Sequence, residues 1–341
     1  MKTQLFNYNL PEELIAQEPP KIRGNARLLV IDRQKREFKH KKYSDISHYL
    51  SPGDCTVLNN TRVYKARIFG YIKRNGKKVE CLGIKPLGTR KWEFIITRAK
   101  SVKLGDEIII SDCCSLNVLS KIEETPLFVV EFIGELPAET FDEYGHTPLP
   151  PYISRNDRDS DYNRYNTVFS REIGSAASPT ASLNLTKEQL GSFETKGVDI
   201  AYVTLHVGWG TFAPVRTEDI EDFKIHSEKY SINSDAINRI NRAKQNGHKV
   251  VAFGTTATRV LETVYSKSPV LPQSGETSLF ICPGYEWKCI DALVTNFHAP
   301  NTSLLMLVAA FVGYDLMIEA YQEALRKRYS FLSYGDSMLI V

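Results

Sequence analysis

The fold is decided by one stretch of sequence, Val198-Asp199-Ile200-Ala201-Tyr202-Val203-Thr204-Leu205-His206-Val207-Gly208-Trp209-Gly210-Thr211-Phe212. Its apolar run is short, rich in β-branched residues and bounded by Gly197 and Gly208, which predicts a buried strand. His206 then stands at the carboxyl end of that strand, beside glycines that let the backbone approach a ligand closely. Ligands of open α/β sheets bind at this end of the strands. A core histidine in an ordinary tight turn explains the segment equally well.

A second junction of this kind is Gly254-Thr255-Thr256, between a predicted strand at Val250–Phe253 and a predicted helix at Ala257–Tyr265. Its backbone amides and hydroxyls suit a carboxylate, a phosphate or a ribose. Arg259 stands about one turn inside that helix, where its side chain can reach an acidic group. Simple capping of the helix by Thr255 or Thr256 is an equally good interpretation.

Three further polar turns occur in this half of the chain, at 174–182, 295–300 and 330–336. The first is rich in small residues and suits a flat ligand, the second contains Asn296 and His298, and the third contains Asp336 as a candidate base or hydroxyl acceptor. The junctions together predict one polar cleft rimmed by His206, Thr255, His298 and Asp336. Such a cleft suits acid–base chemistry on a polar organic ligand, and we expect no metal in it.

The pattern of residues 62–135 is different from the rest. Asn75-Gly76 between apolar-rich runs is a hairpin signal, and about six short strands without helical periodicity predict a small closed barrel. Elsewhere strands alternate with helices, with further strands expected at Leu279–Cys282 and Ala292–Val294. We therefore predict an α/β fold with a mostly parallel sheet and flanking helices, formed by residues 1–61 and 149–341. An inserted small antiparallel β-barrel domain is expected at 62–148.

The composition is that of an ordinary globular protein of 341 residues with a net charge of +3. A chain of this length exceeds the roughly 250–300 residues that one core supports, which agrees with two domains. We find no signal-peptide pattern, and the most apolar run, Leu304–Val312, is too short to span a bilayer. The six cysteines have neither metal-binding nor redox spacing. These features predict a cytoplasmic protein without a membrane partner. The motifs of serine hydrolases, P-loop NTPases, dinucleotide-binding enzymes and zinc peptidases are all absent from the sequence.

The charges are distributed unevenly along the predicted barrel. Between Arg62 and Lys103 there are thirteen Lys or Arg against Glu80 and Glu93, whereas residues 104–150 contain ten Asp or Glu against Lys121 alone. A basic block of this kind is typical of a surface that binds nucleic-acid phosphates. Salt bridges between the two blocks across neighbouring strands are an equally good interpretation.

Motifs along essentially the whole chain resemble those of the S-adenosylmethionine:tRNA ribosyltransferase-isomerases (QueA family) of queuosine synthesis. In order along the chain they lie at 10–17, 58–63, 148–153, 177–181, 204–208, 254–256, 283–285, 295–298 and 333–338. The resemblance implies that the enzyme transfers the ribosyl part of S-adenosylmethionine to the aminomethyl group of a 7-deazaguanine at the tRNA wobble position. The sugar is rearranged into an epoxycyclopentane, and adenine and methionine are released. S-adenosylmethionine is then a consumed co-substrate, and no further cofactor is expected.

The resemblance also implies the site residues and the partners. His206, His298 and Asp336 are the expected catalytic groups, because histidines with pKa values near neutral pH can transfer protons. The expected substrate-binding residues are Asn60, Arg62, Pro179, Thr180, Asn184, Gly208, Gly210, Thr211, Gly254, Thr255, Thr256, Arg259, Asn296 and Tyr334. We expect a monomer that binds the tRNA anticodon stem-loop, with the basic block and aromatic residues as contacts to the RNA, namely Tyr64, Tyr71, Tyr165 and Trp209.

The sequence departs from the family pattern at three places. Ser182-Leu183-Asn184-Leu185 stands where Gly-Leu-His-Phe is usual, Phe223 stands where a histidine is common, and Ser178 replaces an alanine. Two alternatives to the tRNA enzyme therefore remain open at the level of sequence. One is a relative that uses S-adenosylmethionine with a non-tRNA acceptor, and the other is a non-catalytic RNA-binding protein.

Overall fold

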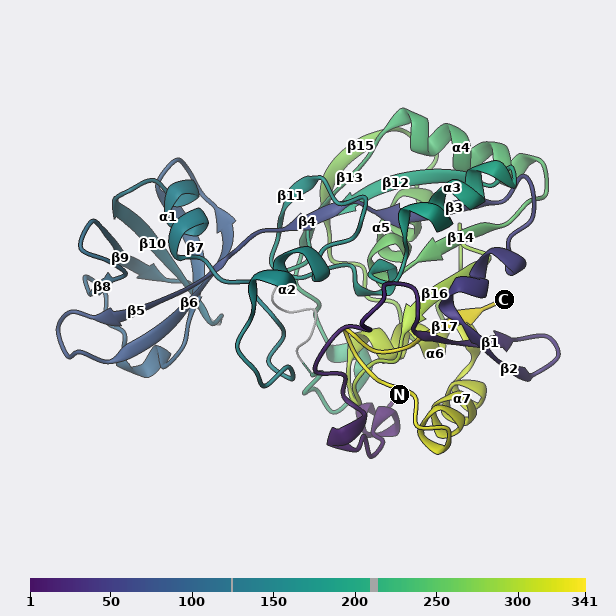
Figure 1. The fold of residues 1–341 in the computed structure, drawn as a ribbon, viewed down its shortest axis with the longest axis horizontal. Coiled ribbons are helices and arrows are strands. Elements are labelled where there is room, and N and C mark those ends of the chain that lie inside the picture. Colours follow the sequence, from purple (N-terminus) through teal and green to yellow (C-terminus); the bar gives the residue numbers. More distant parts are fainter. Residues whose placement is uncertain (124, 209–213) are drawn as a thin grey trace.

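The computed structural model describes residues 1–123, 125–208 and 214–341. These residues form an α/β body and a closed β-barrel, and Figure 1 shows the barrel at one end of the elongated molecule. Strand β2 and helix α7 lie at the opposite end, near both termini. The predicted fold class, an α/β domain with an inserted antiparallel barrel, is confirmed.

The α/β body contains a nine-stranded sheet in the order β15-β13-β12-β3-β14-β16-β17-β1-β2 among the described residues. The four central strands β12, β3, β14 and β16 are parallel, as are β17 and β1, and the other pairs are antiparallel. The sheet is therefore mixed, and the predicted parallel arrangement describes its centre. The strands are β1 (Arg27–Asp32), β2 (Glu37–Lys42), β3 (Cys55–Asn59), β12 (Asp199–Leu205), β13 (Glu228–Ile232), β14 (Val250–Phe253), β15 (Gln273–Thr277), β16 (Ala292–Asn296) and β17 (Ser337–Ile340).

One predicted strand is wrong. Residues Leu279–Cys282 are apolar but form no strand, and the edge strand β15 lies just before them, at Gln273–Thr277. That edge strand is polar and mostly exposed, so it has no apolar alternation by which a sequence pattern could reveal it.

Helices cover both faces of the sheet. Helix α3 begins with the predicted capping box, because Thr186 Oγ1 accepts a hydrogen bond from Gln189 N (3.2 Å) while Gln189 Oε1 accepts one from Thr186 N (3.0 Å). The α-helices of this body are α2 (Asp159–Arg164), α3 (Lys187–Thr195), α4 (Ser234–Gln245), α5 (Thr255–Tyr265), α6 (Ser303–Val312) and α7 (Tyr314–Arg326). Short 3₁₀ helices are η1 (Thr3–Phe6), η2 (Glu12–Leu14), η3 (Tyr43–Tyr49), η5 (Thr180–Ser182) and η7 (Ile220–Asp222).

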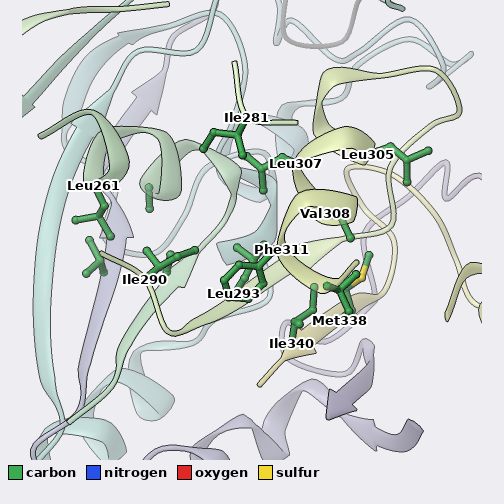
Figure 2. Packing of buried hydrophobic residues seen from close by; sticks show 14 of the residues in the cluster. Leu261, Ile281, Ile290, Leu293, Leu305, Leu307, Val308, Phe311, Met338 and Ile340 are labelled. Carbon is green, nitrogen blue, oxygen red and sulfur yellow. The ribbon is translucent and has the colours of Figure 1, made fainter. Parts of the chain in front are cut away.

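The larger core lies between the sheet and helices α4 to α7, and a smaller one lies on the other face beneath α3 and η3. Figure 2 shows Leu307 and Phe311 of α6 in the larger core together with Leu293 and Ile340 of the sheet. Helix α6 is apolar on nearly all sides because it is surrounded by protein. Among the described residues no single helix has the length and apolarity to cross a membrane, and α6 and α7 meet that criterion only as a pair bent by 114°.

The barrel is closed by six antiparallel strands in the order β10-β7-β6-β5-β8-β9. The predicted hairpin at Asn75-Gly76 joins β5 to β6. Helix α1 (Pro137–Tyr144) places Phe141 against the aromatic interior formed by Phe94 and Phe132. The strands are β5 (Arg67–Ile72), β6 (Lys78–Pro86), β7 (Lys91–Ile96), β8 (Glu107–Ile109), β9 (Cys114–Lys121) and β10 (Leu127–Gly134), with the short helix η4 at Ala99–Ser101.

The two bodies are joined by two chain segments. On the way out, β4 (Thr61–Val63) pairs in parallel with β11 (Glu172–Ser175), so residues 61–63 lie beside the α/β body and the barrel strands begin at Arg67. On the way back, His146 pairs with Arg67 through backbone hydrogen bonds.

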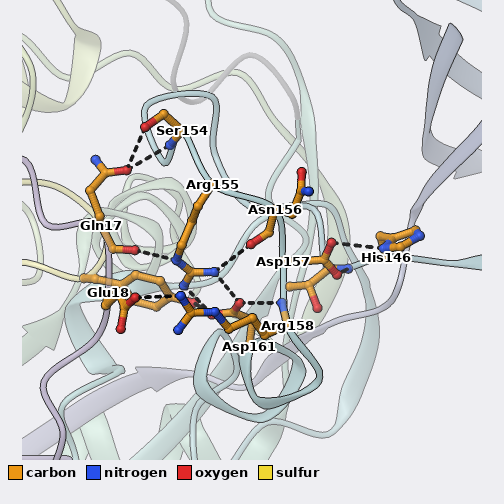
Figure 3. A network of polar contacts seen from close by, with 11 residues as sticks. Gln17, Glu18, His146, Ser154, Arg155, Asn156, Asp157, Arg158 and Asp161 are labelled. Atoms are coloured by element: carbon orange, nitrogen blue, oxygen red, sulfur yellow. Dashed lines mark hydrogen bonds and ion pairs between the residues drawn. The ribbon is translucent and has the colours of Figure 1, made fainter. Parts of the chain in front are cut away.

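The returning segment is held by a polar network around Asp161, shown in Figure 3. Asp161, only 2% exposed, accepts hydrogen bonds from both terminal nitrogens of Arg155 (2.7 and 2.8 Å), from Arg158 N (2.8 Å) and from Tyr334 Oη (3.0 Å). Burial alone would raise the pKa of Asp161, but these hydrogen bonds lower it below its ordinary value. The stability that this network gives to the folded protein therefore depends on pH, because it requires the ionised carboxylate.

We expect Asp161→Asn to lower the free energy of unfolding at pH 7 by about 3 kcal/mol, because it leaves the half-buried Arg155 without its counter-charge. A lowered pKa means that the ionised carboxylate stabilises the fold above about pH 4 and that this contribution is lost as pH falls through the folded-state pKa. Urea unfolding should thus show that the free energies of unfolding of wild type and variant differ less at pH 3 than at pH 7. Asp159→Asn, an exposed position in the same helix, is the control. An equal difference at both pH values would contradict this account.

Candidate active site

The carboxyl ends of β3, β12, β14 and β16 lie at one edge of the sheet. Residues that follow β12 and β14, together with the end of β16, line a small pocket there, which we name the inner pocket. It has a volume of about 30 Å³, and a neighbouring hollow of about 60 Å³ shares Thr180, Asn296 and His298 with it. A space of this size has room for one small polar group. The inner pocket is lined by Ser178, Pro179, Thr180, Ala181, Val207, Gly254, Thr255, Thr256, Thr295, Asn296, His298 and Leu304.

A larger space, which we name the interface cavity, lies between the barrel and the α/β body. Its volume of about 390 Å³ is in the range of small-molecule binding sites. The barrel contributes Lys85 and Glu93, among others, and the α/β body contributes Gly174, His206, Gly208 and the segment 225–229. Val207 lines both spaces, so the inner pocket and the interface cavity meet at the end of β12.

His206 is held at this meeting point by the neighbouring strand. Its Nδ1 lies 2.9 Å from Thr61 Oγ1, and its backbone N donates to Lys229 O (2.9 Å). Gly174 permits this position, because a Cβ there would lie only 2.9 Å from the imidazole ring. Burial lowers the pKa of His206 below its ordinary value, with Glu172 acting in the opposite direction. The predicted placement of His206 at a ligand-sized cavity thus agrees with the structure, and burial favours the neutral form of the ring.

His298 has a different environment. Its ring Nε2 lies 2.8 Å from Thr295 Oγ1, and its backbone N–H donates to Tyr321 Oη (3.0 Å). Burial lowers the pKa of His298 to about 3. The expectation that both histidines titrate near neutral pH is therefore wrong for His298, which is a neutral hydrogen-bonding group in the wall of the inner pocket.

Two hydroxyls of the inner pocket lack a hydrogen-bonding partner among the described residues. These are Ser178 Oγ and Thr256 Oγ1, on residues that are 4% and 7% exposed. The pocket also contains Thr180, which donates to Asn296 Oδ1 (2.8 Å), and the first turn of α5 with its unpaired backbone amides. A buried hydroxyl without a partner is costly, so these groups are arranged for a polar ligand atom.

Arg259 is buried and does not line either space. Its guanidinium pairs with Glu228 and donates from Nε to Leu279 O (3.0 Å). Glu228 in turn lines the interface cavity and accepts a hydrogen bond from Gly208 N (2.7 Å). The acidic group expected for Arg259 is therefore a residue of the protein, and the pair fixes the backbone after His206.

Asp336 also has a structural environment. Its carboxylate accepts hydrogen bonds from Arg27 N (2.7 Å) and Ser330 N (2.8 Å) and pairs with the Arg27 guanidinium (3.1 Å). The side chain lines neither the inner pocket nor the interface cavity. The geometry therefore contradicts the expectation that Asp336 rims the cleft as a base, since its oxygens are already occupied.

Other expected binding residues are placed outside the two spaces. Asn60 pairs with Thr204 Oγ1 (2.7 Å), Tyr334 donates to Asp161, and Arg62 lies over the ring of Tyr162 (5.6 Å). Asn184 is buried and lines neither space. Gly210 and Thr211, with Trp209, lie outside the described residues.

The expected RNA contacts of the barrel are only partly available. Tyr64 and Tyr165 are wrong as stacking residues, because Tyr64 is enclosed by Trp92 and Phe141 and Tyr165 is fully buried. Part of the basic block pairs with the acidic block, through Lys73–Glu107 (2.6 Å) and Arg74–Asp106 (2.7 Å). For these residues the salt-bridge interpretation is correct.

The sequence patterns mark the segments 58–63 and 174–182, which contain Thr61 and Gly174, but they do not identify the contacts of these residues or the role of Glu228. Thr61, Gly174 and Glu228 touch His206 or its backbone neighbour from distant parts of the chain, so only the fold brings them together. Ser178 was visible as a departure from the family pattern, and its place in the inner pocket gives that departure a meaning. Lys85 and Glu93 belong to the barrel, whose contribution to the cavity no local pattern indicates.

Comparison with known proteins adds a second line of evidence. The family model described as queuosine biosynthesis protein matches residues 3–340. A protein of Acetivibrio thermocellus named S-adenosylmethionine:tRNA ribosyltransferase-isomerase is 45% identical, and one of the same name from Clostridioides difficile is 43% identical, each with 100% of both chains covered. The crystal structure of S-adenosylmethionine tRNA ribosyltransferase from Thermotoga maritima is similar with a TM-score of 0.57 and 34% identity, covering 99% of this chain and 100% of that one.

The lowered pKa of His298 leads to a pH dependence of stability. Between about pH 3 and pH 6.5 the unfolded chain binds a proton at this residue and the folded chain does not, so stability rises with pH over that range. We expect His298→Asn to remove part of this rise, measured as the free energy of unfolding in urea at pH 4.5 and pH 7. The matched control is His248→Asn, because His248 lies just before the amino end of β14, away from the inner pocket. A His298 imidazole that titrates above pH 6 by NMR would contradict the assignment.

Proposed function

The chain belongs to the family of queuosine biosynthesis proteins, and from this premise we propose that it is an S-adenosylmethionine:tRNA ribosyltransferase-isomerase. It transfers the ribosyl part of S-adenosylmethionine to the aminomethyl group of 7-aminomethyl-7-deazaguanine at the tRNA wobble position. The sugar is rearranged to the epoxycyclopentane of epoxyqueuosine, and adenine and methionine leave. The observation that carries the proposal is the full-length family match combined with a neutral histidine, His206, at a cavity of suitable size.

In this proposal the inner pocket binds one end of the donor. Its volume of about 30 Å³ suits a group of the size of a carboxylate, which favours the methionine end of S-adenosylmethionine. The first turn of α5 presents backbone amides and the positive end of the helix dipole, and Ser178 and Thr256 add the two unpartnered hydroxyls. The sulfonium and ribose then lie along Val207, toward His206 and the interface cavity.

His206 is the proposed base. The positive sulfur acidifies the adjacent carbon, and a base that accepts its proton must be neutral beforehand. In the tautomer that we propose, Thr61 Oγ1 accepts a hydrogen bond from His206 Nδ1–H (2.9 Å), while its own hydroxyl faces Glu172 O (3.4 Å). That arrangement leaves Nε2 unprotonated, and no partner of Nε2 lies among the described residues. Thr61 is thus a positioning residue that selects the tautomer.

The acceptor enters from the barrel side. The interface cavity has walls from both bodies, and the ion pair Lys85–Glu276 (3.8 Å) joins them at its margin. A nucleotide unstacked from the anticodon loop has access to His206 by this route, in the way that single-stranded RNA is commonly bound. The cavity contains side chains of both charges, which suits a base with hydrogen-bond donors and acceptors.

Two of the three departures from the family pattern lie outside these spaces, whereas the third, Ser178, lines the inner pocket. Phe223 packs edge-on against Phe280 at a centroid distance of 5.3 Å, and Asn184 is buried away from both spaces. Neither therefore supports a different acceptor, and the retained His206 with its Thr61 partner argues against a protein without catalysis.

The test is release of adenine from S-adenosylmethionine, with and without tRNA that carries the aminomethyl-deazaguanine. We expect release only with that tRNA, together with the corresponding mass gain on the RNA. Release without tRNA would indicate another acceptor. No release from folded protein that still binds S-adenosylmethionine would overturn the proposed activity.

The role of His206 gives a further prediction. We expect His206→Ala to reduce turnover by at least about 100-fold and Thr61→Val by about 10-fold, whereas Thr61→Ser retains most of it, because serine keeps the hydroxyl. Since the pKa of His206 is lowered, the acid limb of the pH–rate profile should lie below pH 6.5 in the wild type. An acid limb above pH 7, or equal rates for Thr61→Val and Thr61→Ser, would contradict this role.

A further inference from the structure

A basic hollow lies on the α/β body, away from the barrel. It is an open depression of about 790 Å³ lined by Arg27, His40, Lys41, Lys42, Asp45, Lys327 and Tyr329. Four of these residues are permanent cations, and Asp45 is the one carboxylate in its lining. We name this depression the basic hollow.

The cations of the basic hollow fall into two groups. Arg27 is fixed in place, because it pairs with Asp336, lies over the Tyr329 ring at 4.0 Å and donates to Lys327 O (3.0 Å), just after the end of α7. Lys41, Lys42 and Lys327 are exposed, and among the described residues none of their ammonium groups lies within ion-pairing distance of a carboxylate. Three unpaired ammonium groups therefore surround one fixed guanidinium.

Structural explanations exist for each lysine alone. Lysines on the edge strand β2 oppose edge-to-edge aggregation, and Lys327 follows the end of α7, where the helix dipole favours a cation. Neither explanation requires that lysines from two separate elements converge on one hollow. Three lysine ammonium groups beside the single carboxylate of Asp45 repel one another, and an anionic ligand removes that repulsion.

The sheet register relates the basic hollow to the active site. Asn296 of the inner pocket is paired with Ser337, Ser337 with Leu28, and Leu28 with Lys41. These residues form one row across the sheet, so Lys41 lies three strand spacings, about 14 Å, from Asn296 along the same edge. Successive phosphates along a nucleic-acid strand advance about 3.4 Å, so a few nucleotides cover this distance.

We propose that the basic hollow binds backbone phosphates of the tRNA while the wobble nucleotide occupies the interface cavity. The inference rests on the proposed tRNA substrate and adds a second contact surface, on the side of the active site opposite to the barrel. The lysines contact phosphates without reading sequence, so they position the RNA and contribute a salt-dependent part of its affinity.

The experiment measures the dissociation constant of full-length tRNA over a series of salt concentrations. The variant Lys41→Gln/Lys42→Gln removes two cations of β2, and Lys327→Gln removes one from the second element. The control Lys249→Gln/Lys267→Gln removes the same charge from two exposed lysines outside the basic hollow, one just before β14 and one just after α5. Thermal unfolding and S-adenosylmethionine affinity verify that each variant is folded.

We expect Lys41→Gln/Lys42→Gln to raise the dissociation constant about tenfold. The slope of the logarithm of the binding constant against the logarithm of the salt concentration should become less steep by about two for this variant and by about one for Lys327→Gln. The control should match the wild type. If the wild type binds and modifies tRNA but both hollow variants equal the control, the basic hollow is not an RNA contact and the proposed function stands. If the hollow variants weaken tRNA binding but the wild type releases no adenine, the basic hollow is an RNA contact and the proposed function is wrong. A wild type that does not bind tRNA would overturn both.

Discussion

The structure depends on the parallel pairing of β3 between β12 and β14. Parallel strands end at a common edge, so this pairing places Thr61, His206 and Gly254 near one another although they are far apart in sequence. The hydrogen bond between Thr61 and His206 then crosses from one strand end to the next. The chain continues beyond β3 into the barrel, so the barrel is attached at the edge where ligands bind. Fold and candidate site are thus consequences of the same constraint.

The polar residues near this edge fall into two groups, those that pair with other residues of the protein and those that face the ligand spaces. Arg259, Asp336 and Asp161 are satisfied by protein partners, and a buried charge of this kind maintains the fold only while its partner is present. His206, Ser178 and Thr256 keep ring or hydroxyl positions that no described residue occupies. The second group, rather than the more strongly charged first, faces the ligand spaces. A site of neutral hydrogen-bonding groups suits a reaction in which the substrate itself brings a positive sulfur.

The sequence predicts what depends on neighbours along the chain. The capping box at Thr186, the hairpin at Asn75-Gly76 and the six-stranded barrel follow from local chemistry, and they are confirmed. The partners of Arg259 and Asp336 could not be predicted, because Glu228 and Arg27 come from distant strands and no local pattern indicates which charge meets which. The polar edge strand β15 escaped for a related reason, since an exposed strand has no apolar alternation. The motif junctions identified His206 correctly as a cavity residue, but not the residues that orient it.

The central claim is that a donor held in the inner pocket and an acceptor held in the interface cavity meet at His206. A crystal structure with S-adenosylmethionine and an anticodon stem-loop bound together tests it most directly. The account predicts the methionine carboxylate at Ser178, Thr256 and the first turn of α5, the unstacked nucleotide between the barrel and the α/β body, and His206 Nε2 facing the carbon next to the sulfur. A donor bound elsewhere, or a His206 that contacts neither ligand, would contradict it.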